Sequence, residues 1–215
     1  MKYILCYGDS NTWGASPDQL PRYEFEERWP GIVQKTLGQG VHIYENGLCG
    51  RTTGFTDDVE AGRNGKTGFN HIMEIYAPVD LVVIMLGSND CKVRFSSHPA
   101  WDSALNMSQL AREAEKPCYG RAQTGSGPKI LLVAPAALDT KWEKSWVGHE
   151  FNAASSDKSK ELAGFYKQMA EENGWYFLDA SEYAEVGVDC VHLTKASHAA
   201  LGNMVTEKIR EILQF

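Results

Sequence analysis

Short apolar runs of strand length recur along the chain, and longer segments with room for helices separate them. The runs cover residues 3–7, 41–44, 81–86, 130–134 and 175–178. Strands that alternate with segments of helical length are typical of a parallel sheet whose two faces are covered by helices. The pattern therefore predicts an α/β fold with a parallel sheet of about five strands.

The intervening segments predict helices over residues 29–37, 69–76, 101–115 and 158–172. The last segment of the chain gives the clearest helical signal, beginning near Thr194. Apolar residues recur there at helical spacing among Lys, Glu and Arg, at Leu201, Val205, Ile209 and Ile212. Four connections are longer than a plain parallel sheet needs, and loops of this length are usually functional or form interfaces. They cover residues 15–28, 54–68, 117–128 and 135–157.

Composition excludes several classes of protein and partner. The 215 residues contain no run of eighteen consecutive apolar residues, which argues against a membrane span. The formal net charge is −7, and no basic cluster occurs along the sequence, so neither nucleic acid nor an anionic membrane surface is an expected partner. No Pro, Gly or Ser linker divides the chain. We therefore expect one domain over residues 1–215.

The cysteines and the N-terminal residues indicate the cellular compartment of the protein. The 5 cysteines are widely spaced and form no C-x-x-C pair, which favours reduced thiols in a reducing environment. The apolar run near the N-terminus is too short for the core of a signal peptide, and no cleavage site follows it. These features predict a cytoplasmic protein whose first apolar run is a strand.

Asp9 and Ser10 directly follow the first predicted strand, within a polar turn bracketed by Gly8 and Gly14. In open parallel sheets, ligands bind at the carboxyl ends of the strands, so a serine at this place is a candidate nucleophile. The alternative is that Ser10 only caps the N-terminus of a helix, and this motif alone gives that alternative about half the weight.

Two further turns carry glycine and small polar residues after predicted strands. Gly50 lies in the segment that follows the second strand, and Asn89 in the segment that follows the third. A glycine lets a backbone N–H approach a ligand closely, and an asparagine amide can donate a hydrogen bond. Each signal alone is weak, because glycine and asparagine are ordinary turn residues.

A carboxylate and an imidazole, Asp189 and His192, lie three residues apart before the C-terminal helix. Within one turn the carboxylate can reach Nδ1 of the imidazole and leave Nε2 facing a nucleophile. The alternative is a helix-entry turn with a surface histidine. With strand order 2-1-3-4-5, all four turns would meet at one edge of the sheet, beside the switch point between the first and third strands.

Together, these four blocks resemble the SGNH (GDSL-type) hydrolase superfamily, whose namesake Ser, Gly, Asn and His correspond to Ser10, Gly50, Asn89 and His192. Asp189 stands in the D-x-x-H arrangement of that superfamily. The blocks in residues 6–14, 51–53 and 84–90 are most similar to bacterial arylesterases and acyltransferases and to acetyl-xylan-type carbohydrate esterases. The resemblance implies a three-layer α/β/α sandwich with a five-stranded parallel sheet in flavodoxin-like order 2-1-3-4-5.

The resemblance also implies a mechanism. Ser10 would be the nucleophile, His192 the base and Asp189 the group that orients it. Backbone N–H groups of Ser10 and Gly50 and the Asn89 amide would hold the oxyanion. No metal or organic cofactor is required for this chemistry. We also expect the substrate to contact two residues beside the nucleophile, Trp13 and Asp9.

One departure from the superfamily is Asn11, which stands where its name expects leucine, and we expect the nucleophile to be unaffected. Cys190 lies between the expected acid and base, and a buried structural thiol is the better interpretation. The other five histidines show no metal-ligand spacing, so we assign them no catalytic role.

The expected activity is hydrolysis of small-acyl esters of aryl, alkyl or sugar alcohols through an acyl-enzyme, with acyl transfer as a side activity. The alternatives are a thioesterase or lysophospholipase of the same superfamily, or a non-catalytic carbohydrate-binding protein. Aromatic residues in the loop 142–151 could form a substrate wall or a subunit interface, and both could hold at once. A homo-oligomer is predicted on this basis.

Overall fold

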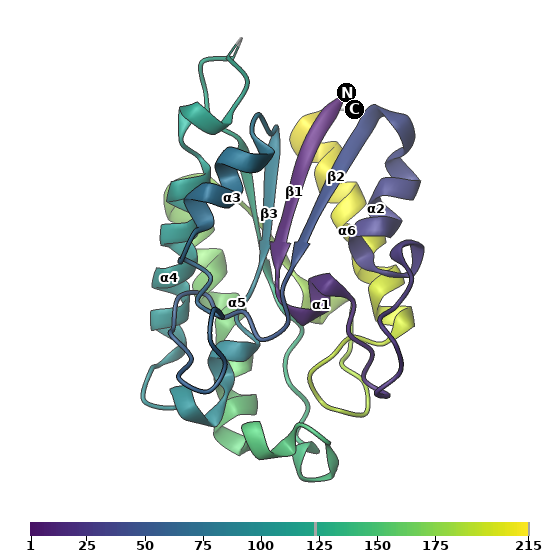
Figure 1. Ribbon diagram of the computed structural model, residues 1–215, viewed down its shortest axis with the longest axis vertical. Coiled ribbons are helices and arrows are strands. Elements are labelled where there is room, and N and C mark those ends of the chain that lie inside the picture. Colours follow the sequence, from purple (N-terminus) through teal and green to yellow (C-terminus); the bar gives the residue numbers. More distant parts are fainter. Residues whose placement is uncertain (123, 215) are drawn as a thin grey trace.

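A computed structural model describes residues 1–122 and 124–214 of the chain. At its centre is a 5-stranded sheet of order β2-β1-β3-β4-β5 in which every neighbouring pair is parallel (Figure 1). The strands are β1 (Lys2–Gly8), β2 (Val41–Gly47), β3 (Leu81–Met85), β4 (Lys129–Ala134) and β5 (Tyr176–Asp179). The predicted sheet and its order are confirmed. Residue 123 of the predicted loop 117–128 and residue 215 lie outside the described residues.

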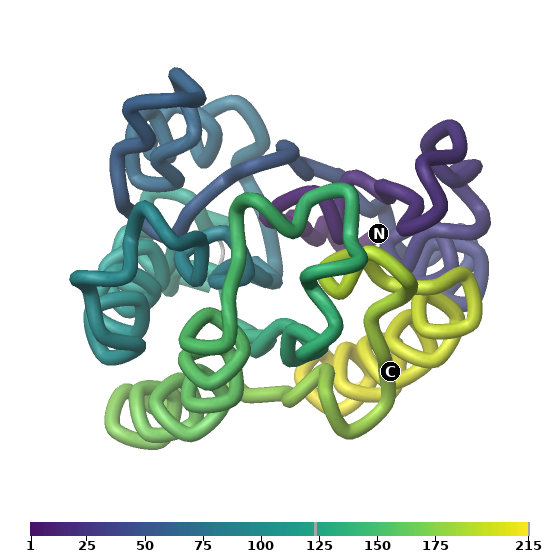
Figure 2. The backbone as a smooth tube through the Cα atoms, turned by 90° about the horizontal axis from the view of Figure 1, so that it is seen from below, coloured from purple at the N-terminus to yellow at the C-terminus, as the bar shows by residue number. Residues whose placement is uncertain are grey.

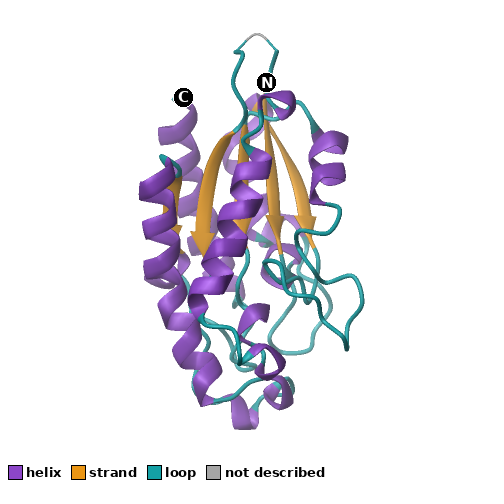
Figure 3. Ribbon diagram, turned by 90° about the vertical axis from the view of Figure 1, so that its left-hand side faces the viewer, coloured by secondary structure: helices purple, strands orange, loops and turns teal. Residues whose placement is uncertain are grey.

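Helices cover both faces of the sheet, which confirms the predicted three layers (Figure 3). Alternate residues of a strand point to opposite faces, so Leu5 and Tyr7 belong to one apolar cluster, and Ile4 and Cys6 to the other. The first cluster packs against α3 (Phe69–Tyr76), α4 (Ala100–Ala114) and α5 (Ala153–Asn173). The second packs against α2 (Trp29–Leu37) and α6 (Lys195–Leu213).

Most helices begin and end close to the predicted residues, and two differences matter. The helix α5 begins at Ala153, before the predicted start at residue 158, because Asn152 caps it and forms a reciprocal capping box with Ser155. A short helix, α1 (Ser10–Trp13), follows β1 directly and was not predicted. Both differences arise at helix N-termini, where local caps outweigh apolar periodicity.

All five strands end at the same edge of the sheet because they are parallel. Figure 2 looks onto this end of the molecule, where the loop before α5 and the turn before α6 lie side by side. Ser145 Oγ of that loop donates to the Asp189 carbonyl at 2.6 Å, and the Asp139 N–H donates to the Cys190 carbonyl at 3.2 Å. These bonds attach the long loop to the segment predicted to carry the acid and base. Over the described ranges, no helix is long and apolar enough to cross a membrane.

Candidate active site

Ser10 is the first residue of α1, at the carboxyl end of β1. Asp9 is the N-cap of this helix, and its Oδ1 accepts the N–H of Asn11 at 2.9 Å. Gly14 ends the helix in the left-handed region with φ of 94°, which a side chain would strain. The alternative in which Ser10 is the capping residue is therefore wrong, because Asp9 does the capping.

His192 connects Ser10 with Asp189 through two hydrogen bonds. Its Nε2 lies 2.9 Å from Ser10 Oγ, and its Nδ1 lies 2.6 Å from Asp189 Oδ2. The other oxygen of the fully buried Asp189 carboxylate accepts the backbone N–H groups of Val191 and His192 at 3.0 and 2.9 Å. The carboxylate thus fixes both the ring and its backbone. The structure brings these three residues together as the sequence predicts, in an arrangement suited to activating a hydroxyl group.

Asn11 holds the histidine segment from both sides. Its Nδ2 donates to the Val191 carbonyl at 3.1 Å, and its Oδ1 accepts the N–H of Leu193 at 2.9 Å. These two backbone groups flank His192, and Asn11 itself is 3% exposed. A leucine at this position could make neither bond. The departure from the superfamily pattern therefore contributes a link between the serine turn and the histidine segment, which the sequence did not reveal.

Gly50 and Asn89 lie together beside Ser10, and all three line one cavity. Asn89 Nδ2 donates to the Arg51 carbonyl at 3.1 Å and lies 3.5 Å from Asp9 Oδ2. The buried Arg51 guanidinium ties the Gly50 turn to the sheet, because it donates to the carbonyls of Gly8 and Asn46 at 2.8 and 2.7 Å. Gly50 has φ of 78°, a conformation that favours glycine.

Asp90 joins the Asn89 turn to the segment after Gly50. Its Oδ2 accepts the N–H of Thr53 at 3.0 Å, and its Oδ1 accepts the Thr53 hydroxyl. Burial raises the pKa of Asp90 to about 6, although the hydrogen bonds from Thr53 oppose that shift. Burial likewise raises the pKa of Asp9 to about 6, against the opposing effect of the Asn11 N–H. Nothing in the local sequence indicated the tie between Asp90 and Thr53.

The cavity beside Ser10 has a volume of about 360 Å³. Trp146, His149 and Phe151 line it, so part of the predicted aromatic loop forms a wall of this site. The Trp146 ring lies nearly parallel to the His192 ring, with 16° between the planes and 6.2 Å between the centroids. The interpretation of this loop as a substrate wall fits this geometry. Its interpretation as a subunit interface stays a prediction.

Two predicted substrate contacts are placed differently. Asp9 is 1% exposed and lies beneath the cavity as the cap of α1, so its carboxylate supports the site without facing a ligand. Trp13 is not among the residues that line the cavity, and the Arg22 guanidinium covers its ring at 4.6 Å. The charged residues that line the cavity were not identified from the sequence, since no motif marks them. They are Glu60, Lys92 and Glu150.

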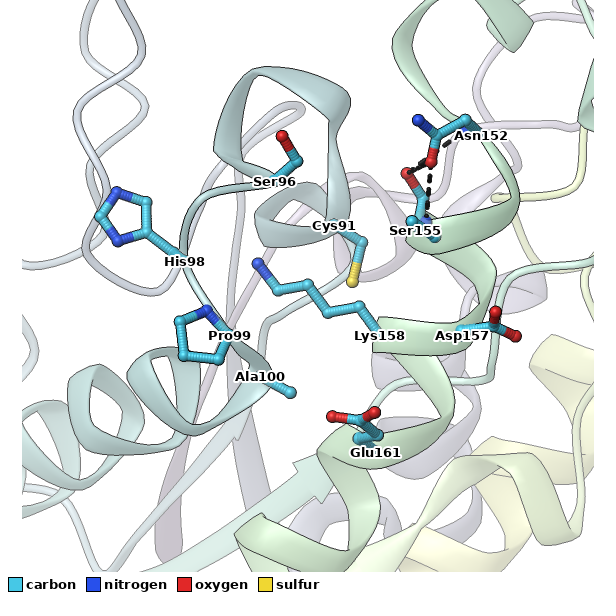
Figure 4. Close-up of a pocket in the computed structure, with 11 residues that line it drawn as sticks. Cys91, Ser96, His98, Pro99, Ala100, Asn152, Ser155, Asp157, Lys158 and Glu161 are labelled. Atoms are coloured by element: carbon cyan, nitrogen blue, oxygen red, sulfur yellow. Dashed lines mark hydrogen bonds between the residues drawn. The ribbon is translucent and has the colours of Figure 1, made fainter.

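A second cavity, of about 270 Å³, lies beside the segment that follows Asn89 (Figure 4). Cys91 lines this second cavity, whereas its neighbour Lys92 lines the first. Lys158 extends into it in the close-up and donates to the carbonyls of Asp90 and Phe95 at 2.7 and 3.4 Å. Its ammonium group is thereby used to hold the segment in place.

The described residues contain no group of His, Cys, Asp and Glu side chains that could hold a metal ion. Cys190 is 2% exposed, and burial raises the pKa of its thiol above the ordinary value. A buried thiol of this kind is a poor nucleophile, in line with the structural interpretation.

Comparison with known proteins agrees with this geometry. Residues 6–200 match the model of the GDSL-like lipase/acylhydrolase family. Est24, a carbohydrate acetylesterase from Sinorhizobium meliloti, is 35% identical, with 99% of this chain and 100% of that chain covered and a TM-score of 0.90. An aryl esterase from M. smegmatis is 34% identical, with 99% and 100% covered and a TM-score of 0.91. No curated protein sequence matches the chain.

Proposed function

The chain belongs to the GDSL-like lipase/acylhydrolase family and is an esterase of that type, and from this we propose that it cleaves small-acyl esters through an acyl-enzyme on Ser10. The observation that carries the proposal is the hydrogen-bonded chain from Ser10 through His192 to Asp189 at the wall of a cavity. A protein that only bound carbohydrate would not require this chain of hydrogen bonds, which argues against a non-catalytic role.

In the proposed mechanism, Ser10 Oγ attacks the acyl carbon while His192 Nε2 takes the hydroxyl proton. Asp189 holds Nδ1–H and stabilises the imidazolium that forms. The same proton then passes to the leaving alcohol, and the carbon–oxygen bond to that alcohol breaks. A water molecule, deprotonated by His192, hydrolyses the acyl-enzyme and restores Ser10.

The negative oxygen of each tetrahedral intermediate would accept hydrogen bonds from the backbone N–H groups of Ser10 and Gly50 and from Asn89 Nδ2. Asn89 and Gly50 border the same cavity as Ser10, which supports this assignment. The buried ties of Arg51 and Asp90 keep these donors in place before the reaction begins. Donors that need no reorganisation give the largest benefit in the transition state.

The proposed substrates are esters of small acyl groups with aryl, alkyl or sugar alcohols. The relatives at 34% and 35% identity are an aryl esterase and a carbohydrate acetylesterase, and a cavity of about 360 Å³ suits a small ester. Acyl transfer is a second candidate activity, because Trp146, Val147 and Phe151 give the cavity an apolar side that can hold an alcohol in place of water.

The test of this proposal is labelling with a fluorophosphonate, which reacts with activated serines. We expect one label on the peptide that contains Ser10, together with turnover of phenyl acetate. His192→Ala should slow both reactions by about a thousandfold, because the hydroxyl then lacks its base. Labelling at another serine, or full turnover by His192→Ala, would contradict the proposal.

Homo-oligomerisation also remains part of the proposal. Trp146 is 46% exposed although its loop lines the cavity, so a neighbouring subunit could cover it. Light scattering at micromolar concentration should give a multiple of the mass of one chain. A mass of a single chain under those conditions would contradict this part.

A further inference from the structure

The cavity beside Ser10 has a polar wall made of Glu60, Lys92 and Glu150, which is separate from the catalytic residues. Lys92 Nζ lies 3.1 Å from Glu60 Oε1 and 2.9 Å from Glu150 Oε2. The Lys92 side chain is 4% exposed, whereas those of Glu60 and Glu150 are 33% and 18% exposed. The two carboxylates are therefore the more accessible part of this wall, and the buried lysine bridges them.

Further charged groups fix the two carboxylates. Arg94 Nη2 lies 2.7 Å from Glu150 Oε1 and 3.5 Å from Glu60 Oε1. Arg63 Nε lies 3.2 Å from Glu60 Oε2, and Arg94 Nε lies 3.1 Å from Asp57 Oδ2. Glu60 thus has cationic partners from two parts of the chain, and Glu150 has two from the segment that follows Asn89. Such a network holds the oxygens in place more firmly than a single surface ion pair would.

The charges of this network balance. Its cations are Lys92, Arg94 and Arg63, and its anions are Glu60, Glu150 and Asp57. Because the three positive and three negative charges offset one another, the net charge of the network favours neither a phosphate nor a quaternary ammonium group. Glu60 Oε2 and both carboxylate oxygens of Glu150 each have one cationic partner, so each has a lone pair left to accept a hydrogen bond from a hydroxyl group.

The polar wall lies next to the predicted oxyanion donors. A Cβ atom placed on Gly50 would lie 2.7 Å from Glu60 Oε2 and 3.2 Å from Arg63 Nε. An unpaired carboxylate so close to Gly50 would repel the negative oxygen of a tetrahedral intermediate. The ion pairs of Glu60 with Lys92 and Arg63 offset that charge, so the carboxylate can serve as a hydrogen-bond acceptor beside the reacting carbon.

The side chain of Trp146 provides an apolar surface in the same cavity, with its ring face roughly parallel to that of His192. A flat aromatic surface combined with fixed carboxylate acceptors suits a ligand that has both C–H faces and hydroxyl groups. We propose that Glu60 and Glu150, held by Lys92, bind the hydroxyl groups of a neutral polyhydroxylated leaving alcohol, such as a sugar, while Ser10 takes its acyl group. This inference rests on the proposed esterase function.

The test compares two acetate esters with different leaving alcohols, an acetylated methyl xyloside and phenyl acetate. Glu150→Gln should lower the ratio of kcat/KM for the xyloside ester to that for phenyl acetate by about tenfold. The xyloside has further hydroxyl groups that can bind the carboxylate, whereas the phenyl group of phenyl acetate has none. The loss should appear mainly in KM. Glu143→Gln, an exposed change in the same loop, should leave both values unaltered.

Glu60→Gln changes the same polar wall at a residue of another loop. It tests the inference even if Glu150→Gln fails to fold. An unchanged ratio in both variants would overturn the inference, as would a wild-type protein that hydrolyses phenyl acetate but not the xyloside ester. In either case Ser10 would still react with a fluorophosphonate. Absence of that reaction would instead reject the esterase function itself.

Discussion

Two buried side chains hold the two halves of the site, and they do so with different chemistry. Asn11 joins the serine turn to the segment around His192 through a neutral amide. Asp90 joins the Asn89 turn to Thr53 through a carboxyl group whose pKa burial raises to about 6. The Asn11 link, in the half proposed to move the proton, therefore has no titrating group, whereas the Asp90 link, in the half proposed to stabilise the oxyanion, has one. The two halves should differ in their response to pH and to mutation.

The largest effect is expected at the centre of the proton-transfer half. Ser10→Ala should lower kcat for phenyl acetate by about a thousandfold or more, because only the oxyanion donors and binding remain. Ser96→Ala provides the matched control, since Ser96 lines the second cavity. Appreciable turnover by the Ser10 variant in a steady-state assay would contradict the assignment of Ser10 as the nucleophile.

At the centre of the oxyanion half, Asn89→Asp should lower kcat by about a hundredfold with KM changed much less. A carboxylate has nearly the same shape as the amide but offers no donor and adds negative charge where the oxyanion forms. The variant should also be less stable by about 1 to 3 kcal/mol, because the new carboxylate oxygen faces the Arg51 carbonyl and Asp9 Oδ2. Near-normal kcat would show that Asn89 only shapes the turn.

Asp90 supports the proposed oxyanion donors through its bonds to Thr53. Asp90→Ala should lower kcat by about tenfold, because Thr53 and the Gly50 turn are then no longer tied to the Asn89 turn. Asp90→Asn should restore most of the activity, since its amide can accept from the Thr53 N–H and donate to the Thr53 hydroxyl. Steady-state kinetics of both variants measure this difference. Equal losses would mean that the charge of Asp90 matters rather than its hydrogen bonds.

The corresponding change in the other half, Asn11→Leu, should lower kcat by a smaller factor of about fivefold. The effect is smaller because Asp189 still bonds the ring and two backbone N–H groups of the histidine segment. The variant should also be less stable by about 1 to 3 kcal/mol, since the buried Val191 carbonyl and Leu193 N–H lose their partner. Urea denaturation and the labelling rate of Ser10 together test this expectation.

The last expected effect is on stability alone, and it separates the two links by their response to pH. The native Asp90 carboxyl, with its pKa raised from 3.8 to about 6, binds its proton more tightly than in the unfolded chain. Its contribution to the free energy of unfolding is therefore present below pH 3.8 and is lost as the pH rises to 6. Relative to the wild type, Asp90→Asn should gain about 1 to 3 kcal/mol across this range.

Asn11→Leu gives the contrast, because its stability deficit should not depend on pH over the same range. The pKa of Asp9 is also raised to about 6, chiefly by burial and in part by the charge of Asp90, so Asp90→Asn should partly relieve that shift and add to the expected gain. Denaturation curves at several pH values decide the matter. A constant difference for Asp90→Asn would contradict the assignment of this titration to Asp90.

The strands and most helices could be predicted because each depends on its own apolar residues, as in β3 and α6. Ser10, His192 and Asp189 could be located because motifs of a known superfamily mark them. The ties made by Asn11 and Asp90, and the wall of Glu60, Lys92 and Glu150, depend on contacts between distant segments. Lys92 and Glu150, for example, gave no local signal although their side chains lie 2.9 Å apart.

The bond between Ser10 and His192 joins residues 182 positions apart, and Asn11 and Leu193 are separated by the same distance along the chain. During synthesis at about 5 to 20 residues per second, His192 would be added to the chain roughly 10 to 40 seconds after Ser10. Until then the polypeptide has a serine but no means of activating it. Under the proposed mechanism, reactivity of Ser10 would consequently report completed folding, and a nascent chain should be inert toward the esters that surround it.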